Sequence, residues 1–271
     1  MQDSPWYLNA LEYSVNTAYT CLPSPRPSIK ELQSCKIIGH RGAHLGTAFI
    51  ENTLPGFEAL VVAGVWGAEM DIRWTKDLVP VISHDPDCQR LFQVALKIAD
   101  TPFSTLRRQV PQIPTLEEIV NAFAGRLHLM LEIKADVFPQ PSRQAAILEQ
   151  LLQPLTPVRD YHLLALDRAL FANTTFAPLQ SQVLVSILNS SRMSKQALEV
   201  NYGGIAGAYP FFTASLRQRH KQIGQRIGVG HIDSKRLLYQ QIANGTDWIF
   251  SNRAIELQNI IRSECEAEKR I

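Results

Sequence analysis

The chain has 271 residues, a length that requires no more than one domain. Its 27 basic and 25 acidic residues leave a net charge of +2 with histidine neutral, and the basic residues are not gathered into an aromatic-laced stripe, so nothing in the charge favours nucleic-acid binding. No apolar run approaches the length of a membrane span, so we expect no integral membrane segment.

Residues 1–35 are expected to form an N-terminal extension that packs against the rest of the chain, with a candidate amphipathic helix from Trp6 to Tyr19. The extension differs from a secretory signal because it lacks a basic start and an uninterrupted apolar core, and it carries Asp3 and Glu12. The four cysteines of the chain are widely spaced and show no metal-binding pair, which favours reduced thiols and a cytoplasmic location.

Four short apolar runs, each closed by polar residues, predict buried strands at residues 36–40, 67–73, 79–84 and 127–134. Residues 53–63 are predicted to form a helix with proline in its first turn. Side chains that can carry chemistry stand at the C-terminal end of each predicted strand. We therefore expect one charged site in the chain.

Residues 85–114 contain no clear barrel element, and about thirty residues are too many for a plain loop in a compact domain. We interpret them as an inserted cap. Its apolar side chains either cover the edge of the pocket or pack as a small satellite core, and the second arrangement is favoured for most of them. These side chains are Leu91, Phe92, Val94, Leu96, Ile98 and Phe103.

Beyond residue 134, predicted helices and strands alternate to the end of the chain, as in a parallel sheet covered by helices. The predicted helices are residues 145–152, 168–174, 194–200, 214–222, 234–243 and 254–265. The predicted strands are residues 162–166, 183–188, 204–208, 226–231 and 248–251. Together with the length, this alternation predicts an α/β fold, a TIM (β/α)8 barrel over residues 36–271 with the cap after its second strand region.

Side chains alternate between the two faces of a strand, so Glu69 and Asp71 point the same way, and the rule also places Glu132 and Lys134 on one face. Buried carboxylates require a positive partner, and a divalent cation is the simplest one. Oxygen ligands suit calcium, magnesium or manganese. Such a cation would leave about one negative charge on three carboxylates, which Arg41 and Lys134 outweigh, so we expect an anionic substrate such as a phosphodiester.

His40 and His84 are the candidates for general base and general acid, because imidazole titrates near neutral pH and cleavage of a phosphodiester needs one proton taken and one given. A single histidine at a strand end is more often a loop or core residue. Two of them, with a carboxylate pair between them at strand spacing, favour a shared catalytic role.

The order and spacing of these residues resemble the glycerophosphodiester phosphodiesterase family over roughly residues 36–255. The residues that carry the resemblance are Gly39–Gly42, Glu51–Thr53, Glu69–Asp71, Thr75–Asp77, His84–Asp85 and Leu131–Lys134. It implies a TIM barrel that hydrolyses glycerophosphodiesters to an alcohol and glycerol 3-phosphate, and it leaves open whether water or the glycerol hydroxyl attacks phosphorus first. It also implies one divalent cation, Ca²⁺ or Mg²⁺ with Mn²⁺ as an alternative. The implied roles are metal binding by Glu69, Asp71 and Glu132, acid–base chemistry by His40 and His84, and phosphate binding by Arg41 and Lys134.

Glu51 matches the acidic residue of the family's Glu-Asn-Thr motif and is expected to contact the substrate or to support the residues that do. Its neighbour Asn52 is either part of the site or the cap of the following helix, since an asparagine side chain can accept a hydrogen bond from an early backbone amide. The sequence leaves both readings open.

The chain departs from the family pattern in four places. The stretch of residues 43–50 is longer than usual, and Leu78 replaces a turn glycine. Residues 229–233 replace a tryptophan-containing strand end, which places His231 near the mouth of the pocket as a candidate substrate-binding residue. Ser251–Asn252 stands where a threonine-aspartate pair is common.

Two other functions remain compatible with the sequence. A phospholipase D-like or sphingomyelinase D-like lyase uses the same residue pattern on the same barrel, and a non-catalytic binding barrel would keep the fold alone. The expected partner of the chain is a small-molecule glycerophosphodiester substrate. The sequence gives no prediction of the oligomeric state.

Overall fold

The computed structural model describes residues 25–136 and 138–268, and within them eight parallel strands close into a barrel. The strands of the barrel are β1 (Lys36–His40), β2 (Gly67–Trp74), β4 (His128–Ile133), β5 (Tyr161–Ala165), β6 (Gln182–Ser186), β7 (Gly204–Ala208), β8 (Arg226–Gly230) and β9 (Trp248–Ser251). The barrel closes because β1 pairs with both β2 and β9. The predicted TIM barrel is confirmed.

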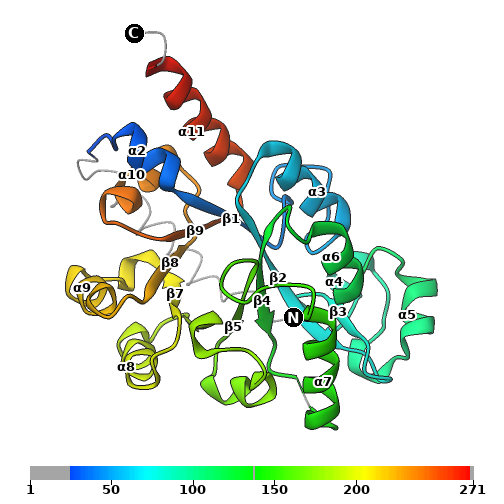
Figure 1. Cartoon of the computed structure of the whole chain (residues 1–271). Helices are drawn as coiled ribbons and strands as arrows, with labels where there is room; N and C mark the ends of the chain where they lie inside the picture. The colour runs from blue at the N-terminus through cyan, green and yellow to red at the C-terminus, as the bar shows by residue number, and fades with distance from the viewer. Residues whose placement is uncertain (1–24, 137, 269–271) are drawn as a thin grey trace.

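Helices surround the barrel in chain order (Figure 1). They are α3 (Leu54–Ala63), α6 (Leu116–Phe123), α7 (Pro141–Leu152), α8 (Ser190–Val200), α9 (Ala214–Gln222), α10 (Lys235–Ala243) and α11 (Ala254–Glu268). The connection after β5 differs from the expected α-helix, because η2 (Arg168–Thr174) is a 3-10 helix and η3 (Leu179–Ser181) follows it. Short 3-10 segments are common as connectors.

Helix α2 (Ile29–Ser34) precedes the barrel and lies beside α11. A capping box starts it, since Ser28 and Glu31 exchange side-chain and backbone hydrogen bonds. Leu32 is buried in the main core. The helix expected from Trp6 to Tyr19 lies outside the described residues.

The predicted strand at residues 79–84 is a shorter strand outside the barrel. β3 (Pro80–Ile82) runs antiparallel to β2, with Ile82 opposite Ile72. The turn between them contains Leu78 with a φ of 65°, in the left-handed region that favours glycine. The return of the chain brings Ser83 back to β2, where its backbone amide donates to the Asp71 carbonyl at 2.9 Å.

The cap consists of α4 (Gln89–Phe92), η1 (Ile98–Asp100), α5 (Phe103–Gln109) and the loops between them. It has its own apolar cluster, in which the fully buried residues are Val81, Cys88, Ile98, Leu106, Val110 and Ile113. Phe92, Val94, Leu96 and Phe103 pack against that cluster. The satellite core favoured by the sequence is confirmed for these side chains and for Ile98.

The inside of the barrel is filled with apolar side chains from alternating strand positions, namely Ile38, Met130, Leu164, Val183, Ala206, Trp248 and Phe250. At the N-terminal ends of the strands, the His128 and His162 rings are hydrogen-bonded at 2.8 Å and Trp66 stacks on His128 at 4.2 Å. The outer core lies between strands and helices and includes Met70 and Ile72. Alternation therefore turns Glu69 and Asp71 into the barrel. Among the described residues, none of the helices is long and apolar enough to cross a membrane.

Candidate active site

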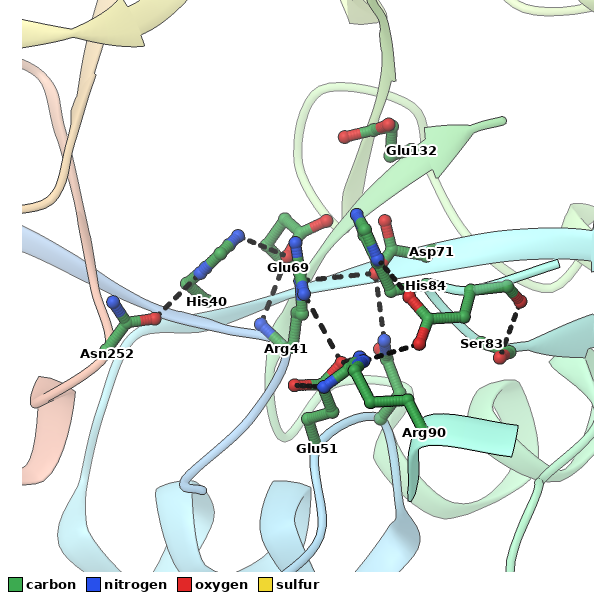
Figure 2. Close-up of polar contacts among 12 residues, drawn as sticks. His40, Arg41, Glu51, Glu69, Asp71, Ser83, His84, Arg90, Glu132 and Asn252 are labelled. Carbon is green, nitrogen blue, oxygen red and sulfur yellow. Dashed lines mark hydrogen bonds and ion pairs between the residues drawn. The ribbon is translucent and has the colours of Figure 1, made fainter. Parts of the chain in front are cut away.

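Three carboxylates from two neighbouring strands meet at the C-terminal end of the barrel (Figure 2). Glu69 and Asp71 lie on β2, and the β2–β4 register places Glu132 opposite Asp71. One oxygen of each lies within 4.8 Å of the others. The side chains of Glu69 and Asp71 are 5% and 1% exposed. The grouping expected from strand alternation is therefore present.

Burial and mutual repulsion hold these carboxylates in different states. Burial, with the charges of Asp71 and Glu132, raises the pKa of Glu69 well above its ordinary value. Burial, and after it the charge of Asp71, also raises the pKa of Glu132. Burial also opposes the charged form of Asp71, but Lys134 and Arg41 outweigh it, and its pKa lies below the ordinary range. Without a cation, Glu69 and Glu132 therefore keep their protons to a higher pH than isolated carboxyl groups do, and a cation would compete with those protons.

Two cationic side chains flank the carboxylates. Lys134 lies with its Nζ 3.1 Å from Asp71 and 2.7 Å from Glu132. Burial opposes the charge of Lys134, but these two carboxylates raise its pKa above the ordinary value. Arg41 donates its backbone amide to Glu69 at 3.0 Å, and its Nε lies 3.7 Å from Asp71. Both cations therefore contact the carboxylate cluster directly.

His40 enters the site from the end of β1. Its Nδ1 lies 2.8 Å from Asn252 Oδ1, and its Nε2 lies 3.9 Å from Glu69 Oε2. Burial, with a smaller contribution from the Arg41 charge, lowers the pKa of His40 to about 4. The ring is therefore neutral near pH 7, with one nitrogen held by an amide oxygen.

His84 reaches the site through the antiparallel return of β3, and not from the end of a barrel strand as the sequence had suggested. Its Nδ1 lies 2.9 Å from Asp85 Oδ1. Arg73 donates two hydrogen bonds to the His84 carbonyl, at 2.8 and 2.6 Å. Burial lowers the pKa of His84, while Asp71 and Asp85 act in the opposite direction. The two histidines thus have different partners, an amide and a carboxylate.

Asn52 is not the helix cap. The cap of α3 is Thr53, and Asn52 instead donates its Nδ2 to Asp71 Oδ2 at 2.8 Å. Asn52 adopts a φ of 57°, which turns its side chain into the site. Its Oδ1 is buried and accepts no hydrogen bond from the described residues. A buried polar atom of this kind fits a site built to receive a further polar group.

Glu51 connects the site to the cap through Arg90 of α4. The Arg90 guanidinium lies 2.5 Å from Glu51 Oε1 and 2.5 Å from Asp85 Oδ2. Glu51 Oε1 also accepts from Arg41 at 3.3 Å. A chain of charged contacts therefore runs from Arg41 to His84 (Figure 2). Sequence reasoning missed Arg90, whose only signal was a basic residue six positions after His84.

His231 lies at the exposed rim of the site, with its ring 6.1 Å from the His40 ring in an edge-on arrangement. Its φ is 63°, in the left-handed region that non-glycine residues seldom adopt. Asn252, which sequence reasoning noted only as a departure from the family pattern, is a direct partner of His40. Each predicted site residue therefore lies at this end of the barrel.

Residues 40–174, about half of the chain, match the sequence model of the glycerophosphoryl diester phosphodiesterase family. The chain belongs to this family. Two similar curated proteins are a glycerophosphodiester phosphodiesterase from Bacillus altitudinis, 27% identical over 129 residues, and glycerophosphodiester phosphodiesterase 1 from Rattus norvegicus, 32% identical over 130 residues. These alignments cover 43% and 41% of this chain, and they span 52% and 39% of the two relatives.

Solved structures of the family share the fold over most of the chain. A phosphodiesterase from Oleispira antarctica, solved in complex with the product sn-glycerol-3-phosphate, aligns with a TM-score of 0.72 and 22% identity over 90% of this chain and 99% of its own. A glycerophosphodiester phosphodiesterase from Thermotoga maritima aligns with a TM-score of 0.70 and 20% identity over 83% and 98%. At these identities the likeness establishes the TIM-barrel fold.

Proposed function

We propose that the protein hydrolyses glycerophosphodiesters to an alcohol and glycerol 3-phosphate in a reaction that requires a divalent cation. The observation that carries the proposal is the carboxylate triad Glu69, Asp71 and Glu132 between two histidines with different hydrogen-bond partners. Membership of the family and the product bound by the Oleispira antarctica relative agree with this substrate class.

The donor set fits one hard divalent cation. Three carboxylate oxygens lie within 4.8 Å of one another, and two of the carboxyl groups have raised pKa values, so a cation would relieve repulsion between them. Oxygen ligands favour Ca²⁺ or Mg²⁺, with Mn²⁺ as an alternative. When bound, the ion would polarise a phosphoryl oxygen. Arg41 and Lys134 would hold the remaining phosphate charge.

His40 and His84 divide the proton transfers. His40 is neutral at working pH, and its Nδ1 is engaged by Asn252, so its Nε2 accepts the proton from the attacking hydroxyl group. His84 is paired with Asp85, a contact that opposes the lowering of its pKa by burial, and it donates to the oxygen of the departing alcohol. Either water or the glycerol hydroxyl can provide the attacking oxygen.

Glu51 and His231 are proposed to take part in substrate binding, Glu51 through Arg41 and His231 by direct contact. Glu51 is buried beside Arg41 and would orient it through their 3.3 Å contact. His231 stands at the exposed rim, where the alcohol part of a phosphodiester would project.

For the location of the protein we propose the cytoplasm. Cys35, Cys88 and Cys265 are unpaired thiols, in agreement with a reducing compartment.

The test is hydrolysis of a panel of glycerophosphodiesters by metal-stripped protein, with calcium, magnesium or manganese added back. Choline, ethanolamine, inositol and glycerol esters and lysophospholipids make up the panel. Release of glycerol 3-phosphate that depends on added metal is the expected result. A cyclic phosphate as the final product would identify the lyase reaction instead, and no turnover with any metal would leave a binding barrel.

The matched variants are Glu69→Gln, in the carboxylate triad, and Glu117→Gln, an exposed carboxylate in the first turn of α6. Loss of turnover in the first and retention in the second would tie the activity to the triad. Equal rates in both would contradict the assignment.

A further inference from the structure

Two places where the chain departs from the family pattern converge on one catalytic side chain. Residues 229 and 230 are the last two of β8, and residues 231–233 follow it. Ser251 is the last residue of β9, which pairs with β8, and Asn252 comes directly after it. β9 also pairs with β1, with Ser251 opposite Gly39, so Asn252 stands next to His40. The two altered segments therefore form one wall beside His40.

The contact of Asn252 with His40 determines which ring nitrogen carries the proton. Asn252 Oδ1 lies 2.8 Å from His40 Nδ1. An amide oxygen can only accept a hydrogen bond, so Nδ1 is the donor. In a neutral ring the other nitrogen, Nε2, then carries the lone pair, and this nitrogen faces Glu69 at 3.9 Å.

Asp233 holds the segment that carries Asn252. Its Oδ1 accepts hydrogen bonds from the Asn252 backbone amide at 3.0 Å and from Ser251 Oγ at 2.8 Å. Ser251 is 1% exposed, and its Oγ in turn accepts from the Arg253 amide at 2.9 Å. The His231 ring lies against the same imidazole, edge-on at 6.1 Å. These contacts fix the backbone from which the Asn252 side chain reaches His40.

We propose that Asn252, held in place by Asp233, is a positioning residue that fixes the ring orientation of His40 and keeps its proton on Nδ1. The proposal rests on the proposed function, in which Nε2 of His40 accepts a proton. An amide orients the ring without adding another negative charge to a site that already contains Glu69, Asp71 and Glu132. A carboxylate at this position would orient the ring but would add that charge.

The experiment compares Asn252→Leu, which removes the acceptor at similar size, with Asn252→Asp, which keeps an acceptor. Asn244→Ala, at an exposed asparagine after α10, is the control. In the metal-loaded full-length protein, Asn252→Leu is expected to lower kcat by about 10- to 1000-fold with KM within about threefold, because the base loses its orientation and tautomer. The kcat of Asn252→Asp is expected to be at least about tenfold higher than that of Asn252→Leu.

Nitrogen-15 NMR of labelled histidine gives a readout that needs neither turnover nor a variant. In wild-type protein the His40 signals are expected to report a proton on Nδ1, and in Asn252→Leu a mixture of both tautomers. A proton on Nε2 in the wild type would overturn the proposal, as would unchanged kcat in Asn252→Leu. If wild-type protein hydrolyses no diester with any metal, the proposed function fails, while the tautomer measurement still decides the role of Asn252.

Discussion

Glu69→Gln is expected to have opposite effects on the metal-free and metal-loaded protein. Burial, then Asp71 and Glu132, raise the pKa of Glu69 in the folded protein well above its ordinary value. The unfolded chain releases this proton earlier as pH rises, so the Glu69 contribution to stability is present at low pH and is lost as pH rises through the raised pKa. Between the pKa of Glu69 in the unfolded chain and its raised pKa in the folded protein, the free energy of unfolding falls by about 1.4 kcal/mol per pH unit. Glutamine has no proton to lose, so the metal-free variant should be the more stable protein at alkaline pH.

Metal binding is expected to reverse the order of stability of the wild type and Glu69→Gln. A cation among the three carboxylates displaces the Glu69 proton, so the affinity of the wild type should rise about tenfold per pH unit below the raised pKa. At 100 times the dissociation constant the cation adds about 2.7 kcal/mol to the free energy of unfolding. For a chain of this size that is roughly 5–10 °C in Tm. Glu69→Gln should show little of this shift.

Differential scanning calorimetry between pH 5 and 9, with and without the cation, measures both effects. Glu117→Gln is the control, since this exposed side chain is not among the three carboxylates. A metal-free Glu69→Gln protein that is less stable than the wild type at every pH would refute the reasoning. So would a metal affinity that does not change with pH.

Two further predictions concern the cap and the N-terminal ends of the barrel strands. Arg90→Met removes the shared partner of Glu51 and Asp85, so kcat/KM should fall about tenfold. The Tm of this variant should change little. The control is Arg253→Met, in a surface ion pair, which should leave the kinetics unchanged. Burial lowers the pKa of His162 to about 3, so the folded wild type loses stability as pH falls below about 6.5, the value in the unfolded chain. In urea unfolding, the stability of His162→Phe relative to the wild type should rise by about 2 kcal/mol from pH 6.5 to 5, and parallel pH profiles would contradict this.

Local patterns were sufficient for most of the fold. The strands at Gly204–Ala208 and Trp248–Ser251 and the helix at Ala214–Gln222 begin and end where the sequence places them, because apolar runs and turn residues mark both ends. Strand alternation alone placed Glu69 and Asp71 on one face. These features depend on neighbours within a few residues.

The features that were missed depend on contacts between distant parts of the chain. The antiparallel direction of β3 is set by its pairing with β2, and this return brings His84 to Asp71. Asn252 meets His40 across 212 positions, and Arg90 meets Glu51 across 39. No local pattern reports such contacts. The alternative reading of Asn52 as a helix cap was wrong, because its interaction with Asp71 on the next strand replaces the local one.

The aromatic and histidine cluster at the N-terminal ends of the strands has a kinetic consequence. His162 and Trp248 are 3% and 2% exposed, and together with the apolar residues inside the barrel they fill its lower half. Among the described residues these side chains close the N-terminal end of the barrel, so in the proposed reaction the substrate and both products would enter and leave at the C-terminal end, where the carboxylates lie. In the proposed reaction, glycerol 3-phosphate that stays bound occupies the route of the next substrate molecule, so its inhibition of turnover should be competitive.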